Sequence, residues 1–178
     1  HTCWHKFRLE RWSSDPEGSD FATLGLSDVT LALPDGRLVR QEFVVSVYDK
    51  FDSAPIVTAL HDVAVDAARR GEALLRGSVC AGSFELPGLI SDLYCAIPLF
   101  FPEEFHVWRG SDPPTVFVWL VPITAPERQV VEERGWESFE RMLESEDPDL
   151  FDIDRPGLLL RDNSSVAEFV VDPGRAVG

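Results

Sequence analysis

The segment TVFVWLVPITAPERQVVEERGW (Thr115–Trp136) decides the fold, because a strongly apolar run turns at a proline into a charged, helix-like run. Val116–Val121 is six apolar residues in a row, whereas a strand covered on one face alternates apolar and polar residues. We therefore expect a strand that is buried on both faces. Thr124 and Glu127 then fit a capping box, in which each backbone amide donates to the other residue's side chain. The junction is predicted to be structural, with a central strand passing into a capped helix.

Two further stretches have the periodicity of helices. Downstream, the segment Trp136–Leu143 places Trp136, Phe139, Met142 and Leu143 on one side of a helix. Upstream, Pro55–Arg70 is predicted to be a helix that buries Ile56, Leu60, Val63, Ala64 and Ala67. Two arginines followed by Gly71 are a typical helix end. Cations are stabilised near the C-terminal end of the helix dipole, and glycine readily adopts the left-handed conformation that ends a helix.

The remaining apolar stretches predict strands. Phe21–Leu33 ends in alternating apolar residues, the turn Pro34–Gly36 follows, and Leu38–Tyr48 is the expected return strand of a hairpin. Leu93–Phe101 is expected to be a buried strand, and Phe105–Trp108 a short partner strand.

Composition limits the classes of partner. The chain has 178 residues and a net charge of −15, which disfavours nucleic acid and anionic membranes because their phosphates would be repelled. Three cysteines without a Cys-x-x-Cys motif indicate a reducing compartment, so we expect a cytoplasmic protein. No apolar run is long enough to cross a bilayer.

The length suits a single domain spanning 1–178, with a core at about 21–160 and peripheral segments at 1–20 and 172–178.

An acidic segment follows the predicted strand–helix junction. It holds eight acids and one base, Arg141, and the acids are Glu137, Glu140, Glu144, Glu146, Asp147, Asp149, Asp152 and Asp154. Such a segment can steer a basic protein partner towards the surface. The alternative interpretation is a solvated face with no binding role.

Motifs for catalysis or metal binding are weak. The chain has no Gly-rich phosphate loop and no Gly-x-Ser-x-Gly motif. His1, Cys3 and His5 alternate at the chain start without a fourth ligand, and the acids at 147–154 lack the glycine and final glutamate of a calcium loop. We therefore expect no catalytic residues, no metal and no cofactor. A metal-dependent hydrolase is the third hypothesis, and it requires His106, Glu104 or Cys80 to converge in one pocket.

A series of short motifs, in order from about Leu24 to Leu143, resembles the suppressor-of-fused (SUFU) domain family, and in particular its shorter bacterial members. The motifs are TLGLSD (Thr23–Asp28), LPDG (Leu33–Gly36), PLFFPEEF (Pro98–Phe105), VFVWLVPIT (Val116–Thr124) with Glu127, and Gly135–Trp136 with Phe139. The resemblance implies an SUFU-like α+β (mixed α/β) fold. We expect a central, mostly antiparallel sheet with buried core strands and two to three packing helices.

The resemblance also implies a function. It predicts a non-enzymatic protein-binding domain. Bacterial members of the family are associated with polymorphic toxin systems, where the domain is thought to be an immunity protein that neutralises a cognate toxin. The expected partner is a basic, nuclease-like toxin domain, which would suit the acidic charge. The alternative is a regulatory domain that captures a peptide by strand addition, as animal members do between two domains.

Overall fold

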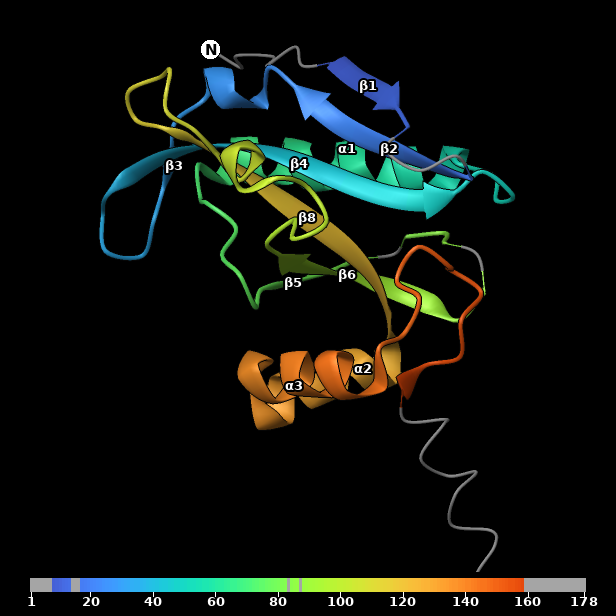
Figure 1. Ribbon diagram of the computed structural model, residues 1–178. Helices are drawn as coiled ribbons and strands as arrows, with labels where there is room; N and C mark the ends of the chain where they lie inside the picture. Colours follow the sequence, from blue (N-terminus) through green and yellow to red (C-terminus); the bar gives the residue numbers. More distant parts are fainter. Residues whose placement is uncertain (1–7, 14–16, 83, 87, 159–178) are drawn as a thin grey trace, which may run out of the picture.

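The computed structural model describes residues 8–13, 17–82, 84–86 and 88–158 (Figure 1). The chain start with His1, Cys3 and His5, and the segment 172–178, lie outside these residues. The elements in chain order are β1 (Arg8–Trp12), β2 (Gly18–Leu24), the 3-10 helix η1 (Leu26–Asp28), β3 (Leu31–Ala32), β4 (Leu38–Tyr48), α1 (Ala54–Arg70), β5 (Val79–Ala81), β6 (Ile90–Ala96), the 3-10 helix η2 (Glu103–Phe105), β7 (Val107–Trp108), β8 (Thr115–Thr124), α2 (Ala125–Arg134) and α3 (Trp136–Glu146).

The strands form one sheet in the order β1-β2-β4-β8-β6-β5, with β3 paired to β4 and β7 paired to β8. All of these pairs are antiparallel except β4 and β8, which run parallel from Arg40 opposite Thr115 to Val44 opposite Trp119. The predicted α+β fold with a mostly antiparallel sheet is therefore confirmed.

Strand β8 lies at the centre of the sheet, between β4 and β6, and it is covered on both faces as its sequence predicts. Val118 and Leu120 belong to the apolar core that also contains the buried face of α1. Trp119 and Val121 belong to a second core with α2 and α3. Alternate side chains of one strand thus enter two separate cores, which is why the run contains no polar residue.

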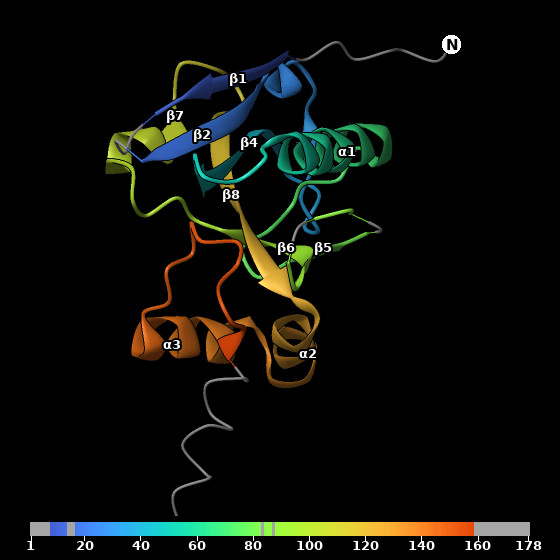
Figure 2. The ribbon, with the colours of Figure 1, turned by 90° about the vertical axis from the view of Figure 1, so that its right-hand side faces the viewer.

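The helices occupy different parts of the sheet. Helix α1 packs against β2 and β4, while α2 packs against β6 and β8 and carries α3 beside it (Figures 1 and 2). The predicted apolar face of α1 is buried, and Gly71 ends the helix in the left-handed conformation (φ 69°). No helix among the described residues is both long enough and apolar enough to cross a membrane.

Three predicted strands are shorter in the structure, among them Phe105–Trp108, of which only Val107–Trp108 is a strand, and one strand was not predicted. The expected strand Leu93–Phe101 is wrong beyond Ala96, because the chain turns at Pro98, where the Phe101 amide donates to the Pro98 carbonyl oxygen (3.0 Å). Of the run Val29–Leu33, only Leu31–Ala32 pairs with β4. Strand β1 carries no alternating apolar pattern, and its place in the sheet comes from pairing with β2.

Candidate functional site

The junction between β8 and α2 contains both halves of the capping box. The Thr124 amide donates to Glu127 Oε2 (2.8 Å), and the Glu127 amide donates to Thr124 Oγ1 (3.4 Å). Both residues are buried. The contacts account for the conformation of the junction and give these two residues a structural role.

Glu127 also holds a buried ion pair that the sequence motifs did not reveal. Arg155 Nη1 lies 2.6 Å from Glu127 Oε1 and Nη2 lies 3.1 Å from Oε2, with both side chains almost fully buried. Arg155 Nη2 donates also to the Pro122 carbonyl oxygen (3.2 Å). Burial raises the pKa of Glu127, but the hydrogen bonds and charge of Arg155 outweigh it and hold that pKa below its ordinary value. The sequence held one signal that could have pointed to this ion pair: Arg155 is the only cation between Met142 and Leu160, in a segment rich in acids.

The eight acids of the predicted partner-binding segment separate into two groups. Three of them are engaged within the chain, and Glu140 is the most buried of the three. Its carboxylate accepts two hydrogen bonds from Arg76, one of them from Nε at 2.9 Å, and a third from the Tyr94 hydroxyl (2.9 Å). Burial, followed by the hydrogen bond to Glu140, raises the pKa of Tyr94 far above its ordinary value. Glu140 therefore ties α3 to β6 and to the loop before β5.

Asp149 and Asp152 connect the segment after α3 to the end of β4. The Tyr48 hydroxyl donates to Asp149 Oδ2 (2.9 Å), and Lys50 Nζ lies 3.0 Å from Asp152 Oδ2. The Phe151 ring, between these two acids, packs edge-on against Tyr48. These contacts hold the turn in place.

The other five acids, Glu137, Glu144, Glu146, Asp147 and Asp154, are exposed, and none of them forms an ion pair with any described residue. Four of them, which we call the α3 acidic surface, lie on α3 or at its end: Glu137, Glu144, Glu146 and Asp147. Glu137, Glu144 and Asp147 are spaced at seven and three residues, so they follow one face of the helix.

An apolar cavity borders this surface. It has a volume of about 280 Å³, and its lining combines apolar and aromatic side chains such as Trp119 and Leu143 with the charged residues Arg76, Glu140, Glu144 and Asp147. Leu99 lines the same cavity and is 73% exposed. A mainly apolar cavity with carboxylates among its lining residues can take an apolar side chain that is flanked by cations.

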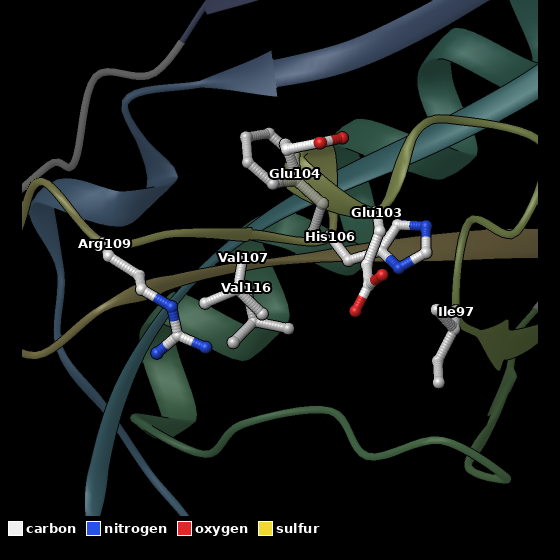
Figure 3. A pocket seen from close by; sticks show the side chains of 8 residues that line it. Ile97, Glu103, Glu104, His106, Val107, Arg109 and Val116 are labelled. Carbon is white, nitrogen blue, oxygen red and sulfur yellow. The ribbon is translucent and has the colours of Figure 1, made fainter.

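Two of the three residues of the hydrolase hypothesis, His106 and Glu104, share a cavity, and the third, Cys80, does not. His106 and Glu104 line a cavity of about 490 Å³ with Glu103 and Arg109 (Figure 3), whereas Cys80 lines another cavity, beside α1. Figure 3 shows the carboxylates of Glu103 and Glu104 pointing in opposite directions.

His106 is engaged in the loop that follows β6. Its Nε2 lies 3.0 Å from the Pro98 carbonyl oxygen and 3.2 Å from that of Phe101, so the ring holds the turn after β6. The part of the chain that the structure describes contains no group of three or more His, Cys, Asp or Glu residues arranged to hold a metal ion.

Comparison with known proteins gives one family. The family model described as suppressor of fused protein (SUFU) matches residues 8–156. Among solved structures, a SUFU homologue from Neisseria gonorrhoeae FA 1090 superposes with a TM-score of 0.69 at 17% identity, covering 86% of this chain and 78% of that chain. The Sufu–Fu complex matches with a TM-score of 0.64 at 11% identity, covering 94% of this chain and 83% of that one. No curated protein matches the sequence significantly.

Proposed function

The chain belongs to the suppressor of fused (SUFU) family, and from that premise we propose that it is a non-enzymatic protein-binding domain, and more specifically an immunity protein that neutralises a cognate basic toxin. A solved structure with this fold is the Sufu–Fu complex, in which a family member is bound to a protein. This chain shares the fold of that complex, so protein binding is the activity we transfer to it.

The observation that carries the proposal is the position of the acids on α3. Glu144 and Glu146 lie in the last turn of the helix, Asp147 caps it, and that turn contains no basic residue. Carboxylates at a helix C-terminus face the negative end of the helix dipole, which costs about 0.3–1 kcal/mol for each charge. Exposed acids that cost stability and form no salt bridge with a described residue are expected at a surface that binds something else.

The charge points to the chemistry of the partner. Proteins that act on nucleic acid carry cations to grip the phosphates, and an acidic inhibitor can occupy that cationic surface. The net charge of −15 would steer such a partner towards the inhibitor, and the cavity beside Glu144 offers an anchor point for an apolar side chain.

A pull-down with matched baits tests the proposal. The baits are the wild-type chain, a variant with Glu137, Glu144 and Glu146 changed to Lys, and a control with Asp62, Asp66 and Glu72 changed to Lys, which alters the charge equally on and after α1. We expect a basic protein to bind the wild type and the control at about 50 mM salt, to elute at higher salt, and to be absent from the α3 variant. Toxicity of that protein in cells, relieved by co-expression of the wild-type chain, would establish the immunity role.

Peptide capture by strand addition is the second candidate, and the edge position of β1 favours it. Strand β1 pairs with β2 on one side only, and so leaves one edge of the sheet open within the described residues. In this case the partner would remain bound to the α3 variant and would be lost when proline is placed in β1. The three baits together with this proline variant therefore separate the two candidates.

A further inference from the structure

Two cysteines that are 15 residues apart in the sequence bring their sulfur atoms close together. Cys80 on β5 and Cys95 on β6 are both free thiols, and their Sγ atoms lie 3.9 Å apart. The Cys95 amide donates to the Ser78 carbonyl oxygen (2.9 Å), and Cys80 follows Ser78 by two residues, so both side chains are on the same face of the sheet. They are diagonal neighbours on adjacent antiparallel strands.

The environments of the two thiols differ. Cys95 is fully buried in the core beneath α1, whereas Cys80 is partly exposed and lines a cavity of about 510 Å³ together with Asp66, Arg70 and Phe84. The hydrogen bond from the Cys95 thiol lowers the pKa of Cys80, against the opposing effects of burial and of Asp66. The pKa of Cys95 is raised, first by that same hydrogen bond and then by burial. A partly exposed thiol with a lowered pKa therefore lies next to a second, buried thiol.

We propose that Cys80 and Cys95 form a reversible dithiol–disulfide pair, in which small hydroperoxides react at Cys80 and Cys95 resolves the product. The Cys80 thiolate attacks the distal peroxide oxygen, the O–O bond breaks, and the alcohol or water leaves with the proton that Cys80 gave up. Cys95 Sγ then attacks Cys80 Sγ, the S–S bond forms, and the S–O bond breaks to release water that carries the Cys95 proton. Overall, two thiols lose two electrons to one peroxide, which is reduced to an alcohol or water and a second water.

The edge position of β5 permits the necessary movement. A disulfide requires an S–S distance of about 2.0 Å, so the two sulfurs must approach further. Strand β5 has three residues and, within the described part of the chain, pairs only with β6, and it is therefore the element that can shift towards its neighbour. In a reducing compartment such a pair would be a transient, peroxide-dependent modification rather than a permanent cross-link.

The experiment treats the folded full-length protein, with Cys3 changed to Ser to remove the third thiol, with one equivalent of hydrogen peroxide. We expect the intact mass to fall by about 2 Da and to recover with dithiothreitol. Cleavage after glutamate separates fragments 73–85 and 86–103, since Glu72, Glu85 and Glu103 bound them. Without reductant the two fragments should remain joined through Cys80 and Cys95.

Two variants establish the order of reaction. In Cys95→Ser, Cys80 should accumulate as a sulfenic acid that a dimedone probe traps, and in Cys80→Ser the buried Cys95 should stay reduced. Separate recovery of the two fragments from the peroxide-treated Cys3→Ser chain, with Cys80 oxidised to the sulfinic acid and Cys95 untouched, would overturn the proposal. Unreacted thiols in the folded protein would overturn it as well. Both of these results come from the Cys3→Ser chain alone, so they stand even if a Cys95 variant folds poorly.

Discussion

At the scale of single residues, the buried ion pair between Glu127 and Arg155 connects more parts of the chain than a single helix cap would. Glu127 serves three parts of the chain at once, since it caps α2, binds Arg155 and accepts the Leu158 amide (3.1 Å). Removing one partner of a buried ion pair leaves the other charge without compensation. The pair therefore fixes the segment after α3 against the end of β8.

Arg155→Met should lower the free energy of unfolding by about 3–5 kcal/mol, because Glu127 would remain buried without a cation. Urea denaturation at neutral pH measures the loss. Arg141→Met is the matched control, since Arg141 is exposed and bonds only to Ser138 among the described residues, and it should change stability by less than about 0.5 kcal/mol. Similar small losses in both variants would show that the ion pair has little role in stability.

The same variant should respond to pH in a defined direction. In the wild type, the lowered pKa of Glu127 contributes stability that is fully present above the ordinary value of 4.5 and is lost as pH falls through the folded-state value. Without Arg155, burial is expected to raise that pKa, so protonation at low pH relieves the penalty. The stability difference between wild type and variant should therefore be smaller at about pH 4 than at about pH 7. If the stability difference between wild type and variant grew larger at low pH, Glu127 would not be the ionised partner of Arg155.

At the scale of elements, the ends of the two C-terminal helices follow opposite rules. Helix α2 begins with a full capping box and ends near Arg134, in agreement with its dipole. Helix α3 ends in acids, against its dipole. The first arrangement serves stability, and the second is the one that we attribute to binding.

Thr124→Ala tests the cap of α2. The variant should lose about 1 kcal/mol of unfolding free energy, since the Glu127 amide loses its acceptor while the Thr124 amide keeps its own contact to the carboxylate. Thermal denaturation compared with Thr58→Ala, an exposed hydroxyl on α1, isolates the effect of the cap. Partner binding should be unchanged. Lost binding with unaltered stability would mean that the junction is functional.

Charge reversal at the two ends of α3 should have opposite effects on stability. Glu144→Lys with Glu146→Lys places cations at the C-terminal end and should raise the unfolding free energy by about 1 kcal/mol, or a few degrees in Tm. Glu137→Lys places a cation in the first turn and should lower Tm slightly. Scanning calorimetry at low salt measures both. Equal shifts of one sign would show that net charge, rather than the helix dipole, determines the response.

The sequence predicted the elements with strong local signals and missed those that depend on distant residues. Strand β8 and the three helices have periodicity and end signals within a few residues of one another. The parallel pairing of β4 with β8 joins residues some 75 positions apart, and no local pattern encodes it. For the candidate binding site, the sequence predicted the acidic segment. It could not predict that Glu140 is hydrogen-bonded to Arg76, because the two residues are 64 positions apart.

At the scale of the whole molecule, the sheet separates the two regions for which we propose roles. Helices α2 and α3 lie together at one end of the molecule, away from α1 (Figure 2). The α3 acidic surface and its cavity belong to that end, while the Cys80–Cys95 pair belongs to the core beneath α1. Binding of a basic partner at one face and peroxide chemistry at the other can therefore be tested independently.

The most direct test of the central claim is the rate of association between this chain and the basic partner recovered in the pull-down, measured against salt. We predict fast binding at low salt that slows as salt rises, and a rate lower by about tenfold or more, with weaker salt dependence, when Glu137, Glu144 and Glu146 are changed to Lys. The control with Asp62, Asp66 and Glu72 changed to Lys should keep most of the wild-type rate. An unchanged association rate for the α3 variant at low salt would contradict the claim that this surface receives the partner.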